Sequence, residues 1–172
     1  HDGVEYVEGS ITDLDDLRRG LDGVDSFVNL VMRTPTSGTQ ASPQEIINNY
    51  QVNTLGLHLL LHTAQDMGVS RGVHTSTFTV HNRSRAWYPS EEEVPLDSDG
   101  VYGLTKGFGE RVCKYFAREF DMNLAVFRIT GPSTRAQFIE RTASDTNSDS
   151  VAFGLMCSAS SRRSRAWSWA TT

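Results

Sequence analysis

Tyr102 and Lys106 are the pair of residues best placed to do chemistry together, because they lie four positions apart in a segment with helical periodicity. Positions i and i+4 share one face of a helix. A free tyrosine titrates near pH ~10, and a cation beside it lowers the pKa of the phenol by favouring the phenolate. The pair therefore predicts a general base. The run Thr75-Ser76-Thr77 ends an apolar segment and supplies hydroxyls that could orient a substrate oxygen toward Tyr102.

The spacing Tyr-x-x-x-Lys is also common on ordinary amphipathic helices, where the tyrosine packs and the lysine is solvated. Three features of the context favour catalysis. The pair begins a predicted helix, it follows the hydroxyl-rich run by 25 residues, and the chain around it alternates strands with helices. The purely structural interpretation stays open at this point.

The first 133 residues alternate between short apolar runs and longer segments with helical periodicity. Strands are predicted over residues 4–7, 26–31, 71–77 and 124–129, and long helices over residues 42–67 and 100–120. Thr12 or Asp13 is expected to cap a shorter helix. The run Ser42-Pro43-Gln44-Glu45 predicts a capping box with proline at the first helical position.

Strands separated by helices need crossover connections, and these predict an α/β fold with a parallel sheet and right-handed crossovers. Ligands on such sheets bind outside the carboxyl ends of the strands. Three segments are expected to meet there: residues 31–35, 77–80 and 130–133.

Several motifs occur together and are more specific than the Tyr-x-x-x-Lys spacing alone. They are Glu8-Gly9-Ser10-Ile11-Thr12-Asp13, Gln51-Val52-Asn53-Thr54-Leu55-Gly56, Thr75-Ser76-Thr77-Phe78-Thr79-Val80, Tyr102-Gly103-Leu104-Thr105-Lys106 and Arg128-Ile129-Thr130-Gly131-Pro132. In this order the chain resembles the extended short-chain dehydrogenases/reductases of the NAD-dependent epimerase/dehydratase type, over about residues 3–133. The resemblance implies a partial Rossmann-type, doubly wound parallel sheet that binds NAD or NADP.

The resemblance also implies roles for single residues. Tyr102 would be the general base or acid, Lys106 would lower its pKa and bind the nicotinamide ribose, and Thr77 would polarise the substrate oxygen. The implied cofactor-binding residues are Ser10, Ile11, Leu30, Val31, Met32, Gln51, Thr75, Tyr102, Lys106 and Gly131. The implied reaction is NAD(P)-dependent oxidoreduction, epimerisation or dehydration at a hydroxyl or keto group of a small molecule, for example a nucleotide sugar.

The chain also departs from the family pattern. The family opens with a strand, a glycine-rich turn and a helix that hold the pyrophosphate, and residues 1–40 contain no such glycine pattern. We therefore expect this chain by itself to bind NAD(H) weakly or not at all. Ser10 stands where Asp is usual, and Gln51 where Asn is usual. Val31 and Met32 are larger than the usual alanines and would crowd the cofactor.

Charge and composition divide the chain into a body and a tail. Residues 1–133 hold 18 acidic and 11 basic residues, net −7, whereas residues 134–172 hold 3 acidic and 5 basic residues, net +2. In the tail 13 of 39 residues are Ser or Thr, and the apolar periodicity is lost. We expect a cofactor-binding domain over residues 1–133 and an irregular or disordered tail over residues 134–172.

Other sequence features limit the classes of partner that we expect. A net charge of −5 and the lack of a long apolar run argue against nucleic acid and membrane partners. Cys113 and Cys157 form no disulfide or zinc pattern, which favours a cytoplasmic location. His58 and His62 are four apart but lack a third ligand, so no metal site is expected. The resemblance implies a homodimer through the helices over residues 42–67 and 100–120.

Two other interpretations stay open. In the first, the chain is a non-catalytic relative that binds a dinucleotide or a partner protein, and the larger Met32 favours this. In the second, the chain is an inert truncated fragment. A fragment that lacks inner strands would expose an unpaired sheet edge and would be poorly soluble. Neither the substrate nor the choice between NAD and NADP follows from these residues.

Overall fold

The computed structural model describes residues 4–35, 41–81, 95–129 and 134–136, together with the backbone of one strand at residues 165–169. Its helices and strands alternate as expected along the body of the chain. They are β1 Glu5–Gly9, α1 Leu14–Leu21, β2 Phe27–Asn29, α2 Pro43–Tyr50, the π-helix η1 Gln51–Gly56, α3 Leu57–Asp66, β3 Arg71–Thr77, the 3-10 helix η2 Phe78–Val80, α4 Val101–Glu119, β4 Asn123–Ile129 and β5 Arg165–Trp169.

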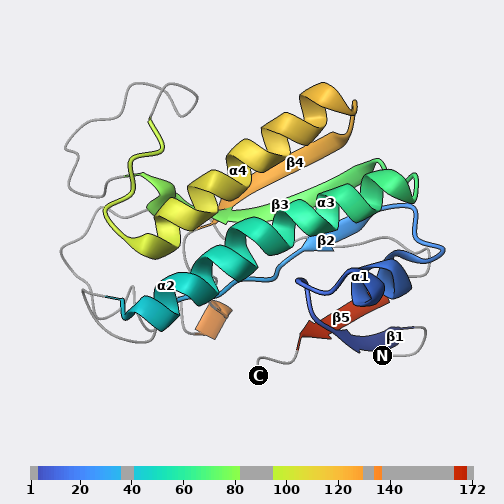
Figure 1. The fold of residues 1–172 in the computed structure, drawn as a ribbon, viewed down its shortest axis with the longest axis horizontal. Coiled ribbons are helices and arrows are strands. Elements are labelled where there is room, and N and C mark those ends of the chain that lie inside the picture. The colour runs from blue at the N-terminus through green and yellow to red at the C-terminus, as the bar shows by residue number, and fades with distance from the viewer. Residues whose placement is uncertain (1–3, 36–40, 82–94, 130–133, 137–164, 170–172) are drawn as a thin grey trace.

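The strands β2, β3 and β4 form a parallel sheet in that order, which confirms the predicted α/β architecture. β3 pairs with β4 along its whole length, from Arg71 opposite Asn123 to Thr77 opposite Ile129. The helices α2, α3 and α4 lie side by side over one face of this sheet (Figure 1). Because all three strands run the same way, their carboxyl ends meet at one edge.

A second sheet pairs β1 with β5 in parallel, from Glu5 opposite Arg165 to Gly9 opposite Trp169. β5 lies within residues 134–172, so the structure differs from the expected irregular tail at these five residues. An edge strand exposes unpaired N–H and C=O groups, and the backbone of β5 satisfies those of β1. Figure 1 shows β1, β5 and α1 grouped at one side of the three-stranded sheet. Residues 137–164 lie outside the described part of the chain.

The apolar core lies between α1, α3, α4 and the sheet, and α1 joins it through Leu17 and Leu21. Ile11 is also buried there, and a Cβ added to Gly56 would overlap its side chain. Cys113 is buried in the same cluster, and burial raises the pKa of its thiol to about 12. Such a thiol carries almost no thiolate at neutral pH, which agrees with a packing role.

The helix predicted over residues 42–67 is continuous but not uniform. Its start confirms the capping box, since the Ser42 backbone N–H donates to Glu45 Oε2 over 2.8 Å and the Glu45 N–H donates to Ser42 Oγ over 3.3 Å. The middle is a π-helix, Gln51–Gly56, which apolar periodicity did not indicate. Single π turns inside α-helices often occur at functional sites.

β2 ends at Asn29 and is therefore shorter than the strand predicted over residues 26–31. The chain beyond it bonds to side chains instead of to a neighbouring strand. Asn29 Oδ1 accepts the Val31 N–H over 3.0 Å, and Asn53 binds both backbone groups of Arg33 over 2.8 Å each. These bonds hold residues 31–33 in a defined path along the edge of the sheet.

α4 agrees with the helix predicted over residues 100–120, with Gly100 as its N-cap. It buries polar as well as apolar residues, among them Thr105, Lys106 and Glu110. Within the described part of the chain, neither α4 nor any other helix is long and apolar enough to cross a membrane.

A buried ion pair joins α4 to β4. Arg128 Nη2 lies 2.8 Å from Glu110 Oε2, and Arg128 Nε donates to Glu110 Oε1 over 3.0 Å. Ser76 Oγ donates to the same carboxylate over 2.5 Å, which adds β3 to the contact. Burial opposes ionisation of Glu110, but the hydrogen bonds from Arg128 and Ser76 outweigh it and lower the pKa of the carboxyl.

Replacing Glu110→Gln should lower the free energy of unfolding by about 3 kcal/mol, because it leaves the Arg128 charge without its buried partner. Denaturant unfolding measures the change. Glu119→Gln is the matched control, since Glu119 pairs with Arg118 at the surface, where one ion pair contributes about 1 kcal/mol or less. Equal effects of the two substitutions would contradict a structural role for the buried pair.

Because of the buried His74, we expect the free energy of unfolding to decrease in acid. It is buried between β2 and α4, its Nδ1 lies 3.2 Å from Asn29 Nδ2, and burial and the Lys106 charge lower its pKa to about 3. An unfolded histidine titrates near pH ~6.5, so below that pH only the unfolded state gains this proton. The free energy of unfolding should fall by up to about 1.4 kcal/mol per pH unit from pH ~6.5 toward the folded pKa.

Chemical unfolding at a series of pH values tests this. His74→Leu should flatten the pH dependence below pH ~6.5, whatever its effect on stability at neutral pH. The exposed His58, changed to Leu in a parallel sample, should keep the slope of the parent protein. An unchanged slope in His74→Leu would assign the acid sensitivity to other groups.

Candidate active site

The predicted chemical groups meet where β2 and β3 end and α4 begins. Thr77 is the last residue of β3, and Tyr102 lies in the first turn of α4. Gly103 permits this approach, because a Cβ there would overlap the Thr79 carbonyl oxygen of η2. The close packing of α4 on η2 therefore places the Tyr102 side chain beside the end of β3.

Tyr102 is half-buried, and its hydroxyl donates to the thioether sulfur of Met32 over 3.4 Å. Burial raises the pKa of Tyr102, and a hydrogen bond with the Thr77 side chain opposes the rise. Lys106 is not among the causes of this shift, so its expected lowering of the Tyr102 pKa is not seen.

Lys106 is 1% exposed, and its Nζ donates to the Thr75 carbonyl oxygen over 2.5 Å. Burial lowers the pKa of Lys106 to about 8, although the charge of the nearby Glu110 carboxylate opposes this. An ammonium has three N–H donors. The Thr75 carbonyl oxygen accepts from one of them.

Asn53 is a site residue that the sequence motif contained but that sequence reasoning did not select. It is buried in η1, and its Nδ2 donates to Thr105 Oγ1 on α4 over 3.0 Å and to the Arg33 carbonyl. Thr54 Oγ1 adds a bond to the Thr105 carbonyl over 3.0 Å. A polar residue on the buried face of a helix was the available signal, because such residues are usually hydrogen-bonded.

A second polar cluster lies behind these residues. His81 Nδ1 lies 3.0 Å from the Pro95 carbonyl oxygen, and its Nε2 lies 3.1 Å from Arg128 Nη1. The Pro95 carbonyl can only accept a hydrogen bond and the Arg128 guanidinium can only donate one. These two contacts therefore fit a neutral imidazole with its proton on Nδ1. The cluster ties the segment after β3 to the segment before α4.

Of the other predicted cofactor-binding residues, three follow β2 at the same edge. Leu30 and Met32 are exposed and Val31 is half-buried. Gln51 is exposed at the start of η1, two residues before Asn53. Among these positions, Met32 is linked to Tyr102 by the contact of its sulfur with the phenolic hydroxyl.

The predicted adenine-side residues belong to the other sheet. Ser10 follows β1, and its N–H donates to Asp16 Oδ2 over 2.7 Å while its hydroxyl bonds Thr12 Oγ1 over 2.9 Å. The Ile11 side chain lies in the core. The structure thus assembles the predicted catalytic residues but not the adenine-side ones around them. Gly131 lies outside the described residues.

Comparison with known proteins finds relatives that match parts of this chain. A uronate dehydrogenase of Agrobacterium fabrum is 34% identical over 83 residues, which are 46% of this chain and 30% of that protein. A short-chain dehydrogenase/reductase superfamily structure from Agrobacterium tumefaciens with bound NAD has a TM-score of 0.68 at 28% identity, and covers 77% of this chain and 39% of that one. A double mutant of the dTDP-glucose 4,6-dehydratase of Streptomyces venezuelae with NAD bound has a TM-score of 0.58 at 27% identity, over 79% of this chain and 44% of that one.

The chain therefore spans less than a third of the uronate dehydrogenase and less than half of either structure. A family model, the NAD dependent epimerase/dehydratase family, matches residues 1–152. That match covers most of the chain and includes both the hydroxyl-rich end of β3 and the Tyr102–Lys106 pair on α4. The parallel sheet, the site at its carboxyl edge and this match agree, and the chain belongs to the NAD-dependent epimerase/dehydratase family.

Proposed function

We propose that the full-length protein is an NAD(P)-dependent oxidoreductase or epimerase/dehydratase with Tyr102, Lys106 and Thr77 as its catalytic residues. The observation that carries the proposal is the meeting of three groups at one sheet edge. The Thr77 side chain acts to lower the pKa of Tyr102, and Lys106 is buried against Thr75 in the strand that ends in Thr77. Perturbed titratable groups of this kind gather at catalytic sites more often than elsewhere.

The proposed substrate is a sugar derivative with a hydroxyl or keto group, and a nucleotide sugar is the leading candidate. Two relatives support this class by name, a uronate dehydrogenase and a dTDP-glucose 4,6-dehydratase. Thr77 and Tyr102 are both hydroxyl-bearing, so they suit a single polar oxygen on the reacting carbon. Nothing in the pair requires a charged substrate group at that oxygen.

The residues present fit the reactive end of a dinucleotide cofactor. Lys106 retains donors for a ribose hydroxyl, and the Tyr102 hydroxyl lies at the same edge of the sheet. We take NAD as the cofactor, because the family is described as NAD dependent. When bound, the nicotinamide would supply a hydride acceptor or donor.

The protein's own residues would manage the proton. Thr77 would hold the substrate oxygen, and Tyr102 would give a proton to that oxygen or take one from it at its phenolic oxygen. Because burial raises the pKa of Tyr102, the phenol is protonated at neutral pH and is ready to act as an acid toward a keto oxygen. In the opposite direction the Lys106 charge, one helical turn away, would favour the phenolate.

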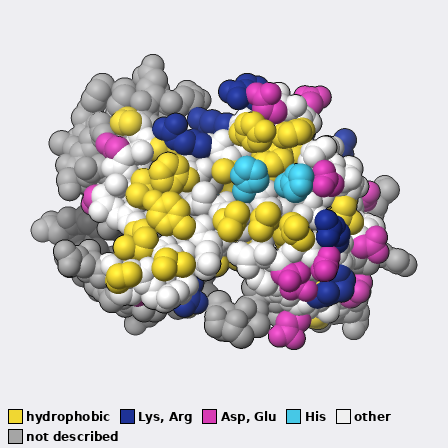
Figure 2. Space-filling view, in the orientation of Figure 1, with side chains coloured by type: hydrophobic (Ala, Val, Ile, Leu, Met, Phe, Trp, Pro, Cys, Tyr) yellow, Lys and Arg dark blue, Asp and Glu magenta, His cyan; other side chains and the backbone are white. Residues whose placement is uncertain are grey.

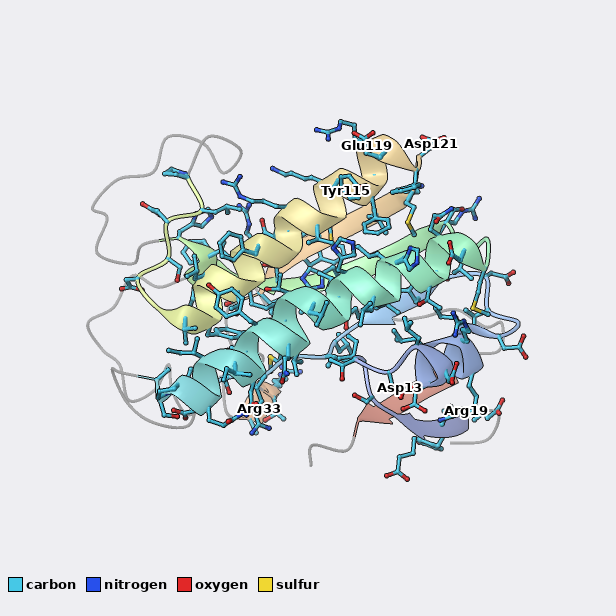
Figure 3. The ribbon with its side chains drawn as sticks, viewed as in Figure 1. Asp13, Arg19, Arg33, Tyr115, Glu119 and Asp121 are labelled. Carbon is cyan, nitrogen blue, oxygen red and sulfur yellow. The ribbon has the colours of Figure 1, made fainter. Side chains whose placement is uncertain are left out.

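Changing Tyr102→Phe in the full-length protein should lower turnover by about 10²–10⁴-fold, the usual contribution of general acid–base catalysis. The measurement is NAD(H) absorbance with uronic acids, UDP-glucose and dTDP-glucose as substrates. Tyr115→Phe is the control, since Tyr115 lies on the same helix toward the end where Glu119 and Asp121 lie (Figure 3). NADH binding without turnover by the parent protein would instead favour a non-catalytic dinucleotide-binding protein, whereas near-normal turnover by Tyr102→Phe would rule out Tyr102 as the general acid or base.

We also propose that two copies associate through α2, α3 and α4. Hydrophobic side chains gather over these helices in Figure 2. The exposed apolar residues on them include Ile46, Ile47, Tyr50, Leu104, Phe108 and Tyr115. The rings of Tyr50 and Phe108 lie 6.2 Å apart and join the two helices into one apolar surface. An exposed apolar surface of this kind is typical of an association site.

Phe108→Glu should convert the dimer to a monomer, because it places a charge at the centre of the apolar surface. Light scattering on the full-length protein measures the mass. Leu14→Glu is the matched control on α1, where an exposed leucine lies away from this surface, and it should leave the mass unchanged. A monomeric parent protein would contradict the proposal.

A further inference from the structure

The side chain of Met32 contacts the hydroxyl of Tyr102. The phenolic O–H donates to the Met32 sulfur over 3.4 Å, although the two residues lie 70 positions apart. The Met32 side chain is nevertheless 54% exposed. It therefore lies over the phenol from the solvent side of the protein and is not part of the core.

The backbone on both sides of Met32 is held by buried asparagines. Before it, Asn29 Oδ1 accepts the Val31 N–H over 3.0 Å. After it, Asn53 accepts the Arg33 N–H and donates to the Arg33 carbonyl, each over 2.8 Å. Figure 3 shows Arg33 beneath α2, where this segment passes. The path of the chain through residue 32 is thus set by its neighbours, and the side chain alone is free to rotate.

A thioether side chain can cover the Tyr102 hydroxyl and still be displaced easily by a ligand. Sulfur is a weak hydrogen-bond acceptor, so a keto or hydroxyl oxygen replaces it at the phenol with a gain. Met is unbranched and has three rotatable bonds, so it adopts another position at small cost. While in place, it adds to the burial that raises the pKa of Tyr102.

We propose that Met32 is a gate residue: its side chain covers the Tyr102 hydroxyl and turns aside when a substrate oxygen binds there. The proposal rests on the proposed function of Tyr102 and adds a specificity element to it. The gate admits only ligands whose oxygen replaces the sulfur contact. A ligand without such an oxygen has to compete with Met32 for the same space and gains no hydrogen bond in return.

Chemical accessibility of Tyr102 tests the cover directly and needs no activity. The full-length parent, Met32→Ala and Met32→Leu are treated with tetranitromethane, and mass spectrometry follows nitration of the peptides that contain Tyr102 and Tyr115. Met32→Ala should speed nitration of Tyr102 several-fold relative to Tyr115, because it removes the cover. Met32→Leu keeps the volume of the side chain and should nitrate Tyr102 at the rate of the parent.

Unchanged nitration of Tyr102 in Met32→Ala would overturn the proposal, and so would equal acceleration in Met32→Leu, since volume would then not matter. A second arm uses whichever sugar derivative the protein turns over. A closed gate reduces apparent affinity, so Met32→Ala should lower KM more than it changes kcat. If no sugar derivative is turned over, the proposed function fails, while the nitration result still decides whether Met32 covers Tyr102.

Discussion

The hydrogen bonds of the Asn53 side chain are the contacts on which the site depends. One buried amide binds the backbone of Arg33 after β2, the hydroxyl of Thr105 on α4, and Asn49 one helical turn earlier. A buried polar group that loses its partners costs about 1–3 kcal/mol, so the three segments are held in one arrangement. That arrangement brings Met32 and Tyr102, which belong to different elements, into contact.

The space between β3 and α4 is polar to a degree unusual for a protein interior. Lys106, Glu110 and His74 are almost fully buried there, and each has a displaced pKa. Glu110 on α4 pairs with Arg128 on β4 and also accepts a hydrogen bond from Ser76 on β3. The pair therefore joins these three elements. Lys106 differs, because its ammonium donates to the backbone carbonyl of Thr75 and not to a carboxylate. The same region thus combines a structural ion pair with a buried cation at the edge where β3 ends.

The chain is organised around two parallel sheets, and among the described strands none of one sheet pairs with a strand of the other. Packing of α1 against α3, and of Ile11 against Gly56, connects them instead. The predicted adenine-side residues therefore stand on a unit whose position relative to Tyr102 depends on side-chain packing. The catalytic candidates stand on the sheet of β2, β3 and β4, where backbone hydrogen bonds fix the register.

The amino-acid sequence by itself determined the elements whose signals are local. The bounds of β3, the capping box at Ser42, and the shared helix face of Tyr102 and Lys106 all follow from neighbours within a few residues. Tertiary structure alone decided the pairing of β5 with β1, the direction of the Lys106 ammonium toward Thr75, and the contact of Met32 with Tyr102. The physical reason is that these contacts join residues far apart in the chain. Their partners are selected by how strands and helices pack, and no spacing in the sequence records that choice.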